Sequence, residues 1–460
     1  MSIPGPPDKP SRPTWRSPSA KHQRRIDLMV LFGSAFLIAA GGGWAVLFAW
    51  RGLWASVPME IWLVITGIAS IVLTRRQKTQ EAGLLLMATL FITLCGICLV
   101  LDVPSANTHR STHNLLPALG ACAFLLLRGR HPVLRHGTSV AFLIAYVVFD
   151  ATTFGLSTAY VWPADIRSLN AWGNDLFSIA TLYMALMVIQ ADVTARNALE
   201  ADLRNALIEN QFVLHYQPQV NGKGQVIGAE ALVRWKHPRH GMVPPGDFIP
   251  LAEQTGLILP LGEWVLKEAC TQLAIWARHP DTAALKLAVN VSARQFRQPD
   301  FVALVLNIVE RCGVDPHLLK LELTESMLVN DVDDIIAKMK GLKERGVSFS
   351  LDDFGTGFSS LSYLKRLPLD QLKIDQTFVR DLLTNPHDAA IASTVVSLGQ
   401  NLGLEVIAEG VETEGQRAFL LSIGCLLFQG YFFSKPVPVA EFDAYVKRSH
   451  HAPLEPAAGG

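Results

Sequence analysis

Two kinds of hydrophobic pattern divide this chain. Residues 28–50 (LMVLFGSAFLIAAGGGWAVLFAW) carry no charge, and apolar runs follow at about 53–73, 82–101, 115–127, from near Thr138, and at about 172–191. A helix needs about 20 apolar residues to cross a bilayer. The pattern predicts six spans, with five as the alternative count because the run at 115–127 is short. The first run is too long for a cleaved secretory signal, and further spans follow it.

From residue 212 onward, short apolar runs alternate with helical ones. The expected strands are 212–219, 226–235, 285–292, 319–325, 347–353, 371–376, 404–410 and 425–432. Only VNGKGQ separates the first two, which is typical of a hairpin and predicts an antiparallel pair. Helical stretches such as 300–312 and 388–402 separate later strands. The expected fold is therefore an α-helical transmembrane bundle followed by an α/β, (β/α)8 TIM-like barrel with an antiparallel first strand.

An amphipathic helix joins the two halves. Ala198, Leu199, Leu203, Ala206 and Leu207 recur at helical spacing between charged residues. Such a helix could pair across a dimer and carry a signal, or act as a passive spacer. We expect a basic tail (1–25), a transmembrane region of about six helices (26–192), a linker helix (193–210), the barrel (211–447) and a flexible tail (448–460).

Charge bears on partners and orientation. The 460 residues contain 40 Lys and Arg and 40 Asp and Glu, so no overall field favours binding of duplex DNA or RNA. The basic residues cluster before the first span and in the loops after the second and fourth, whereas the opposite loops hold only Arg51, Arg110 and Arg167. The positive-inside rule then places both termini in the cytoplasm.

Cysteines and membrane charges offer few further candidates. The six cysteines are scattered in apolar runs, which favours reduced thiols over a disulfide framework. Asp150 lies in the fifth apolar stretch, as an intramembrane functional carboxylate or at the mouth of the span. His109 and His113 fall in an outer loop, where they could bind a metal, sense pH or simply be solvated.

Polar side chains end nearly every expected strand of the barrel. They are Glu230, Asn290, Glu322, Asp352, Asp353, Lys373, Glu409 and Gln429, each embedded among apolar residues. In a (β/α)8 barrel the chemistry lies at the C-terminal ends of the strands. A buried carboxylate is costly unless it is paired or bound to a metal. These residues are therefore expected to converge on one site.

The ligand types indicate which metal such a site would hold. Carboxylates and an amide, without His or Cys, favour Mg²⁺ or Mn²⁺ over zinc. Adjacent aspartates can hold two ions, and paired ions about 3.5–4 Å apart are the usual device for phosphodiester cleavage. Lys373 could orient or deprotonate the attacking water, or be a structural salt bridge within the barrel.

The ordered motifs of the second half resemble the EAL-domain phosphodiesterases, which hydrolyse cyclic di-guanylate. The resemblance covers about residues 200–447 and rests on YQPQV, GAEALVRW, VNVSARQF, LELTES, LDDFGTGFSSL, LKIDQTFV, AEGVE and QGYFFSKP. It implies the EAL fold and two ions, Mg²⁺ or Mn²⁺. The implied ligands are Glu230, Asn290, Glu322 and Asp352 for the first ion, and Asp352 and Asp353, with Glu409 nearby, for the second.

The resemblance also implies the other roles. Lys373 would help activate the water, and Gln217, Arg234 and Gln429 would contact cyclic di-GMP. The loop DFGTGFSSL, with Gly355 and Gly357, would link the metal site to a homodimer interface, braced by Glu325, while Glu412 would support the site. The product would be linear pGpG. The enzyme would face the cytoplasm from a bacterial inner membrane, with the multi-pass region as the input for a signal.

Three other functions stay open from the residues alone. The barrel could be a receptor that binds cyclic di-GMP without cutting it, although the complete ligand set argues against this. It could be the regulatory tail of a transporter or channel. It could also hydrolyse another phosphodiester.

Overall fold

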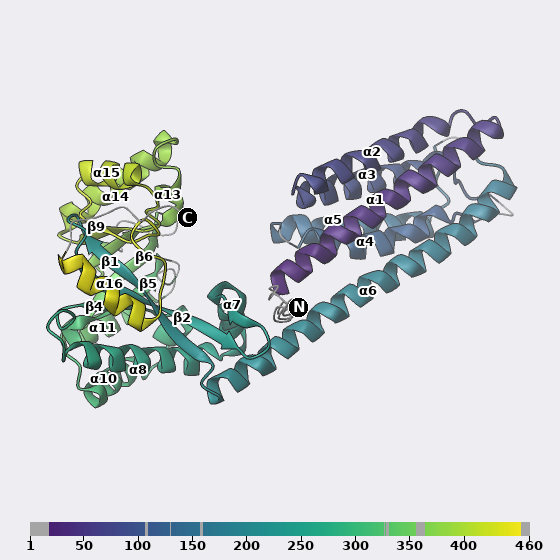
Figure 1. Cartoon of the computed structure of the whole chain (residues 1–460). Coiled ribbons are helices and arrows are strands. Elements are labelled where there is room, and N and C mark those ends of the chain that lie inside the picture. The colour runs from purple at the N-terminus through teal and green to yellow at the C-terminus, as the bar shows by residue number, and fades with distance from the viewer. Residues whose placement is uncertain are drawn as a thin grey trace, which may run out of the picture. The chain divides into compact units, whose positions relative to one another are not determined.

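A computed structural model describes residues 18–105, 109–128, 130–156, 160–325, 327, 331–355 and 364–451, without the side chains of 18–22, 353, 450 and 451. The predicted tails fall largely outside these ranges, as does Gly357. The chain forms two compact units that divide between Ala198 and Leu199. Figure 1 shows the bundle in purple to blue and the barrel in teal to yellow.

The first unit is a bundle of helices. They are α1 (Pro18–Trp50), α2 (Val57–Arg75), α3 (Thr79–Val100), the 3-10 turn η1 (Thr112–Asn114), α4 (Leu115–Leu126), α5 (Pro132–Ala151) and the first part of α6 (Ala164–Ile208). In the described part of the chain, five of them, α1, α2, α3, α5 and α6, are long and apolar enough to cross a membrane. The expected fourth span, α4, is about 18 Å long at 1.5 Å per residue, shorter than the hydrocarbon core of a bilayer of about 30 Å.

Small residues allow α1 and α2 to approach closely. A Cβ atom at Gly67 of α2 would lie 2.8 Å from the carbonyl oxygen of Ser34 in α1. Only glycine fits there without a shift of the helices, which is how many apolar helices pack without a hydrophobic driving force.

Ion pairs mark the two ends of the bundle. Asp192 of α6 lies 2.5 Å from Arg25 near the start of α1 and 3.6 Å from Arg128, just after α4. At the other end, Arg51 after α1 pairs with Asp165 at the start of α6, at 2.9 Å. Helix α4 therefore runs back toward the end where α1 begins, and successive helices alternate in direction (Figure 1).

The polar residues expected near the outer loop have unequal surroundings. Asp150 lies in the last turn of α5 with its side chain 62% exposed, 3.3 Å from Nε2 of His113. His113 itself is buried and stacks on Tyr146, so this histidine is not simply solvated. Asp102, which the hydrophobic pattern did not single out, is buried and pairs with Arg167 at 3.1 Å.

The second unit is the expected closed barrel. Its strands are β1 (Phe212–Asn221), β2 (Val226–His237), β3 (Gly241–Val243), β4 (Lys286–Asn290), β5 (Leu319–Thr324), β6 (Ser348–Phe354), β7 (Gln371–Ile374), β8 (Glu405–Ala408) and β9 (Leu427–Phe428). They follow the order β1-β9-β8-β7-β6-β5-β4-β2-β3, and a β1–β2 pairing closes the ring. The predicted antiparallel hairpin is confirmed, and β1 also pairs antiparallel with β9. Strand β3, an addition to β2, was not expected.

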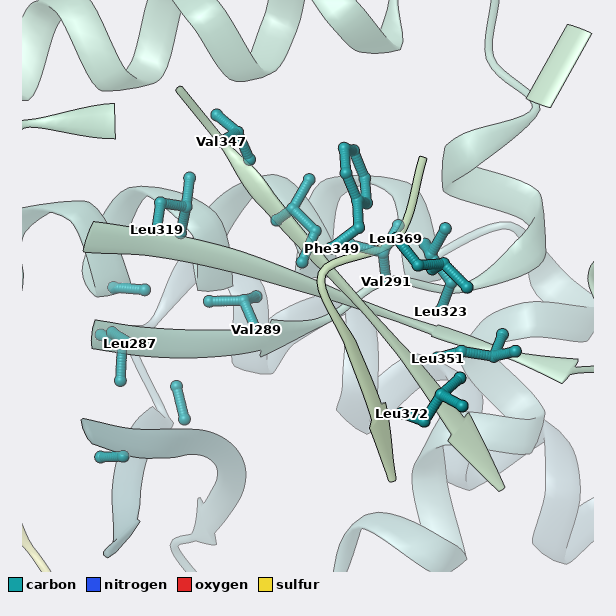
Figure 2. Packing of buried hydrophobic residues seen from close by; sticks show 14 of the residues in the cluster. Leu287, Val289, Val291, Leu319, Leu323, Val347, Phe349, Leu351, Leu369 and Leu372 are labelled. Atoms are coloured by element: carbon teal, nitrogen blue, oxygen red, sulfur yellow. The ribbon is translucent and has the colours of Figure 1, made fainter. Parts of the chain in front are cut away.

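Period-two alternation separates core from site in the parallel strands. Leu319, Leu321 and Leu323 of β5 belong to the apolar cluster, whereas Lys320 and Glu322 between them bond to residues of β7. Figure 2 shows the apolar side chains of neighbouring strands, among them Val289, Phe349 and Leu351, gathered in this cluster. Successive side chains of a strand point to opposite faces, so the same strands supply a dry outer core and a polar interior.

Helices cover the barrel and pack on that apolar face. They are α7 (Pro245–Thr255), α8 (Ile258–Trp276), α9 (Ala293–Phe296), α10 (Phe301–Cys312), the 3-10 turn η2 (Pro316–Leu318), α11 (Val332–Lys343), α13 (Gln376–Arg380), α14 (Pro386–Leu402), α15 (Glu414–Ser422) and α16 (Val439–His451).

The predicted linker segment is the last part of α6. Leu199, Leu203 and Ala206 pack with Phe212 and Trp235 in a cluster beside the main core of the barrel. Asp202 on the same stretch lies 3.3 Å from His237 and 3.1 Å from Arg239. The end of this helix is thus packed on β1 and β2 rather than free.

Candidate active site

Strand register brings the predicted polar residues to one mouth of the barrel. Gln217 of β1 lies opposite Glu230 of β2, and Asn290 of β4 opposite Glu322 of β5. Asp352 lies in β6 and Lys373 in β7, while Glu409 directly follows β8 and Gln429 directly follows β9. The backbone amide of Gln429 donates to the carbonyl oxygen of Ala408 at 2.9 Å. This bond extends the hydrogen-bonded pairing of β8 and β9 past their last paired residues.

Lys373 stands at the centre of the site. Its Nζ lies 2.7 Å from Glu322, 3.4 Å from Asp352 and 3.8 Å from Glu230, and it also contacts Glu409. The side chain is completely buried. One ammonium therefore faces four carboxyl groups, more than it can neutralise when all four are ionised.

Amide side chains support Glu230. Asn290 Nδ2 donates to Oε1 and Gln429 Nε2 donates to Oε2, each at 2.5 Å. Gln429 also donates to Gln217 Oε1 at 3.1 Å and accepts from Gln219 at 3.0 Å. This chain of amides fixes the carboxylate that opens the E-A-L sequence, Glu230 to Leu232.

The surplus of carboxylates shifts their proton affinities. Burial, with repulsion from Glu230 and Asp352, raises the pKa of Glu322 to about 8, although Lys373 opposes the shift. Burial also raises the pKa of Glu409 well above its usual range. For Glu230, burial alone would raise the pKa, but Lys373, Gln429 and Asn290 outweigh it and lower the pKa.

The pKa of Lys373 is raised as well, but by the neighbouring carboxylates rather than by burial. Burial disfavours its charge, but the surrounding carboxylates outweigh that cost and raise its pKa well above the usual range. The ammonium is therefore firmly protonated in the barrel as described. The surplus of carboxylates over ammonium groups means that the site can accept further positive charge.

The donor set fits divalent cations that prefer oxygen. Oε1 of Glu322 is buried and has no hydrogen-bond partner among the residues that the structure describes. An orphaned buried acceptor is costly unless something binds it. Within the same ranges, no three His, Cys, Asp or Glu side chains are arranged around a common empty point. Lys373 contacts four of the carboxyl groups at the mouth.

The remaining predicted residues are placed differently from one another. Arg234 is half-buried on β2, and burial lowers the pKa of its guanidinium. Glu325 is buried, and its Oε2 accepts a hydrogen bond of 3.2 Å from the amide of Gly355. Asp353 follows Asp352 in β6, but its side chain lies outside the description. Glu412 is exposed; Gln416 holds its backbone amide at 2.8 Å, and no described contact joins its carboxylate to the site.

A second polar layer lies one step down the strands and was not predicted. Lys320 Nζ donates to Gln371 Oε1 at 2.9 Å, and Ser350 donates to the same oxygen at 3.2 Å. Each residue precedes a site residue by two positions, namely Glu322, Lys373 and Asp352. The alternation of the strands could have revealed this layer, because residues two apart share a face.

The fold and this constellation define a closed (β/α)8-type barrel with a carboxylate-rich mouth centred on a lysine. The model of the family described as "EAL domain" matches residues 200–436. The chain belongs to the EAL domain family.

Known relatives cover the same part of the chain. The bifunctional diguanylate cyclase/cyclic di-GMP phosphodiesterase MucR of Pseudomonas aeruginosa is 49% identical over 248 residues, which are 53% of this chain and 36% of that protein. The cyclic di-GMP phosphodiesterase NbdA of the same organism is 44% identical over 252 residues, 54% of this chain and 32% of that protein. The chain thus spans about a third of the length of the curated relatives it matches.

Solved structures agree on the barrel. The structure titled "PaMucR Phosphodiesterase, c-di-GMP complex" is 48% identical, has a TM-score of 0.52, and covers 53% of this chain and 99% of that chain. The EAL enzyme Bd1971 in its cAMP-bound form is 32% identical with a TM-score of 0.53, covering 58% of this chain and 75% of that chain.

Proposed function

We propose that this protein is a phosphodiesterase that hydrolyses cyclic di-GMP to linear pGpG. The observation that carries the proposal is the buried contact of Lys373 with four carboxylates at the barrel mouth, in a member of the EAL family. A purely structural salt bridge needs one carboxylate per ammonium. Four carboxylates, one with an orphaned oxygen, are instead typical of a site that binds cations.

Two Mg²⁺ or Mn²⁺ ions fit this donor set. Glu230, Asn290, Glu322 and Asp352 would hold the first, and Asp352 and Asp353 the second, with Glu409 nearby. Bound ions of this kind neutralise charge that develops on a phosphoryl group and favour in-line displacement.

The side chains of the chain itself bind, orient and hold protons. Lys373, protonated in the barrel, can orient a water through its N–H groups and stabilise the charge of the phosphodiester. It can act as a base only when its carboxylate partners are engaged elsewhere. Gln217, Gln429 and Arg234 are the groups at the mouth that would contact the dinucleotide, and the guanidinium suits a phosphate.

The segment after β6 would couple the site to a second copy of the chain. Glu325 holds the amide of Gly355 at the start of this segment. We propose that it leads to a homodimer interface, with Gly357 giving further freedom and Glu412 supporting the mouth from the neighbouring loop. We also propose the domain limits that the sequence pattern predicts, with the linker helix at 193–210 and the barrel at 211–447.

We further propose that the helical unit anchors the enzyme in a bacterial inner membrane and regulates it. Five helices could cross a membrane by length and composition. The alternation of helix directions, together with basic residues at the end that holds Arg25 and Arg128, supports placing both termini and the enzyme in the cytoplasm.

One assay separates the enzyme from a non-catalytic receptor. The full chain in detergent, with Mg²⁺ or Mn²⁺, is incubated with cyclic di-GMP, and products are resolved by chromatography. We expect pGpG from the parent and from Lys236→Met, an exposed lysine of β2. Glu230→Gln should lose at least about a hundredfold in kcat/KM, since it removes a proposed ligand. Binding without product in the parent would favour the receptor.

A further inference from the structure

The helical unit contains a partly open cavity of about 440 Å³. Residues of α1, α2, α3, α4 and α6 line it, so every wall belongs to the bundle itself. The volume lies within the range of small-molecule sites, about 300–1,000 Å³. Its lining is almost entirely apolar.

Glu60 is the one charged side chain in that lining. It lies in the first turn of α2 and is 5% exposed. Among the described residues, no hydrogen bond or ion pair reaches its carboxylate. An ionised carboxylate in such an apolar lining is costly without a partner, so Glu60 either takes up a proton or pairs with a cation.

The facing helix leaves room for this carboxylate. A Cβ atom at Gly41 of α1 would lie 3.1 Å from the carbonyl oxygen of Glu60 and 3.6 Å from its Oε2. Gly41 begins the sequence Gly-Gly-Gly-Trp, and Trp44 and Phe48 follow on the same face, one and two turns along the helix.

The lining also contains aromatic rings, neutral amides and the hydroxyl groups of Thr112 and Thr181. Phe36 stacks on Phe177 at 4.2 Å, and Phe48 stacks on Trp162 at 5.3 Å. Asn170 and Asn174 also line the cavity. Nearby arginines are already committed, because Arg167 pairs with Asp102 and Arg110 bonds to backbone carbonyls. The cavity thus combines one carboxylate with several aromatic rings in its lining, and both groups attract an organic cation.

We propose that this cavity binds a lipophilic amine, whose ammonium pairs with Glu60 and whose apolar body lies against the aromatic side chains. The amine supplies the hydrogen-bond donors and the positive charge that the bundle does not give to Glu60. The site stands independently of the phosphodiesterase activity.

The test uses three probes with one apolar body, namely 4-phenylbutylamine, 4-phenylbutanol and 4-phenylbutyrate. The full chain is held in nanodiscs of zwitterionic lipid, and binding is followed by tryptophan fluorescence with empty nanodiscs subtracted. Trp44 and Trp162 line the cavity and report directly. We expect the amine to bind about tenfold or more tightly than the alcohol, from a charge-assisted hydrogen bond, and the carboxylate to bind weakest.

Two pairs of variants locate the binding. Glu60→Gln should remove the advantage of the amine and leave the affinity of the alcohol unchanged, whereas Glu81→Gln, an exposed glutamate of α3, should change neither. Gly173 lines the cavity, whereas Gly42 does not. At both positions an added Cβ atom would meet no other atom within 4 Å. Gly173→Leu should therefore abolish binding of amine and alcohol, while Gly42→Leu should preserve both.

Equal affinities for the amine and the alcohol would overturn the proposal and show an apolar space suited to a lipid chain. So would an amine preference that survives in Glu60→Gln. Loss of cyclic di-GMP hydrolysis has no bearing on either result.

Discussion

Nζ of Lys373 lies 2.7 Å from Oε2 of Glu322, and both side chains are almost completely buried inside the barrel. This contact joins β5 to β7 across the interior, past the intervening strand β6. Of the four carboxyl groups near Lys373, that of Glu322 is the most deeply buried. The side chains of the site are thus already in contact without a ligand. The excess of carboxyl groups over ammonium groups, rather than an empty space, is what favours binding of a cation.

Lys373→Met should make the barrel unstable without divalent cations. Removing the ammonium leaves several buried carboxylates unpaired, which costs about 3–5 kcal/mol in the free energy of unfolding. We expect a lower thermal midpoint in EDTA and a partial recovery in Mg²⁺, measured by calorimetry on the full chain.

Lys320→Met is the matched control for that variant. Lys320 is also buried, but it bonds to Gln371 in the layer below the site. Its thermal midpoint should not gain from Mg²⁺ beyond the gain of the parent. A similar Mg²⁺ response in both lysine variants would contradict a cation site centred on Lys373.

Glu322→Gln should separate stability from activity. A neutral amide keeps an oxygen toward Lys373 and replaces a carboxyl whose pKa is already raised to about 8 by burial and by repulsion from Glu230 and Asp352, so in EDTA the variant should be at least as stable as the parent. Mg²⁺ should stabilise it less, and its hydrolysis of cyclic di-GMP should fall by at least about a hundredfold. A variant that is both less stable in EDTA and fully active would be inconsistent with the proposed role.

Much of this site could be predicted because of strand periodicity. Asn290 and Glu322 interrupt apolar strands at or near their C-terminal ends, and Glu230 lies near the end of the part of β2 that pairs with β4, so their meeting follows from the barrel itself. Periodicity does not show how a loop after a strand is oriented. The exposure of Glu412, which lies in such a loop, could therefore not be predicted. The position of Lys373 at the centre of the carboxylates depends on side-chain contacts across the barrel, which no pattern along one strand contains.

The helical unit was predictable in outline only. Apolar runs locate the helices, but a lone charge such as Glu60 in a continuous apolar run gives no sign of which neighbour it faces. The partnership of Asp102 with Arg167 joins segments 65 residues apart. Such pairs depend on how helices are rotated against each other, which hydrophobicity does not specify.

Gly355→Ala should impair catalysis more than stability. Gly355 has φ 105°, and a Cβ atom there would lie 3.0 Å from the ring of Phe378. The strain should shift the amide that Glu325 holds and lower kcat/KM by about tenfold or more.

Gly313→Ala is its control, because Gly313 has φ 63° with open space around it. That change should cost about 1 kcal/mol in the free energy of unfolding and leave kcat/KM unchanged. Equal losses of kcat/KM in the two variants would remove any special role for the turn at Gly355.

The short helix α4 should still bring the chain back across the membrane. Asp192 contacts both Arg25 and Arg128, which places the end of α4 at the same end of the bundle as the start of α1. We expect Arg128→Cys, in a chain whose six native cysteines are replaced, to react with a membrane-impermeant maleimide only after cells are permeabilised. Arg51→Cys, at the opposite end, should react in spheroplasts.

If α4 did not cross, five spans would remain, Arg128→Cys would react in spheroplasts, and the barrel would face away from the cytoplasm. The ion pairs of Asp192 favour the arrangement with six crossings. The polar segment before α4 can lengthen the path of this short helix across the membrane, and the backbone amides of Ser111 and Thr112 in it donate to Asp102 at 2.9 Å.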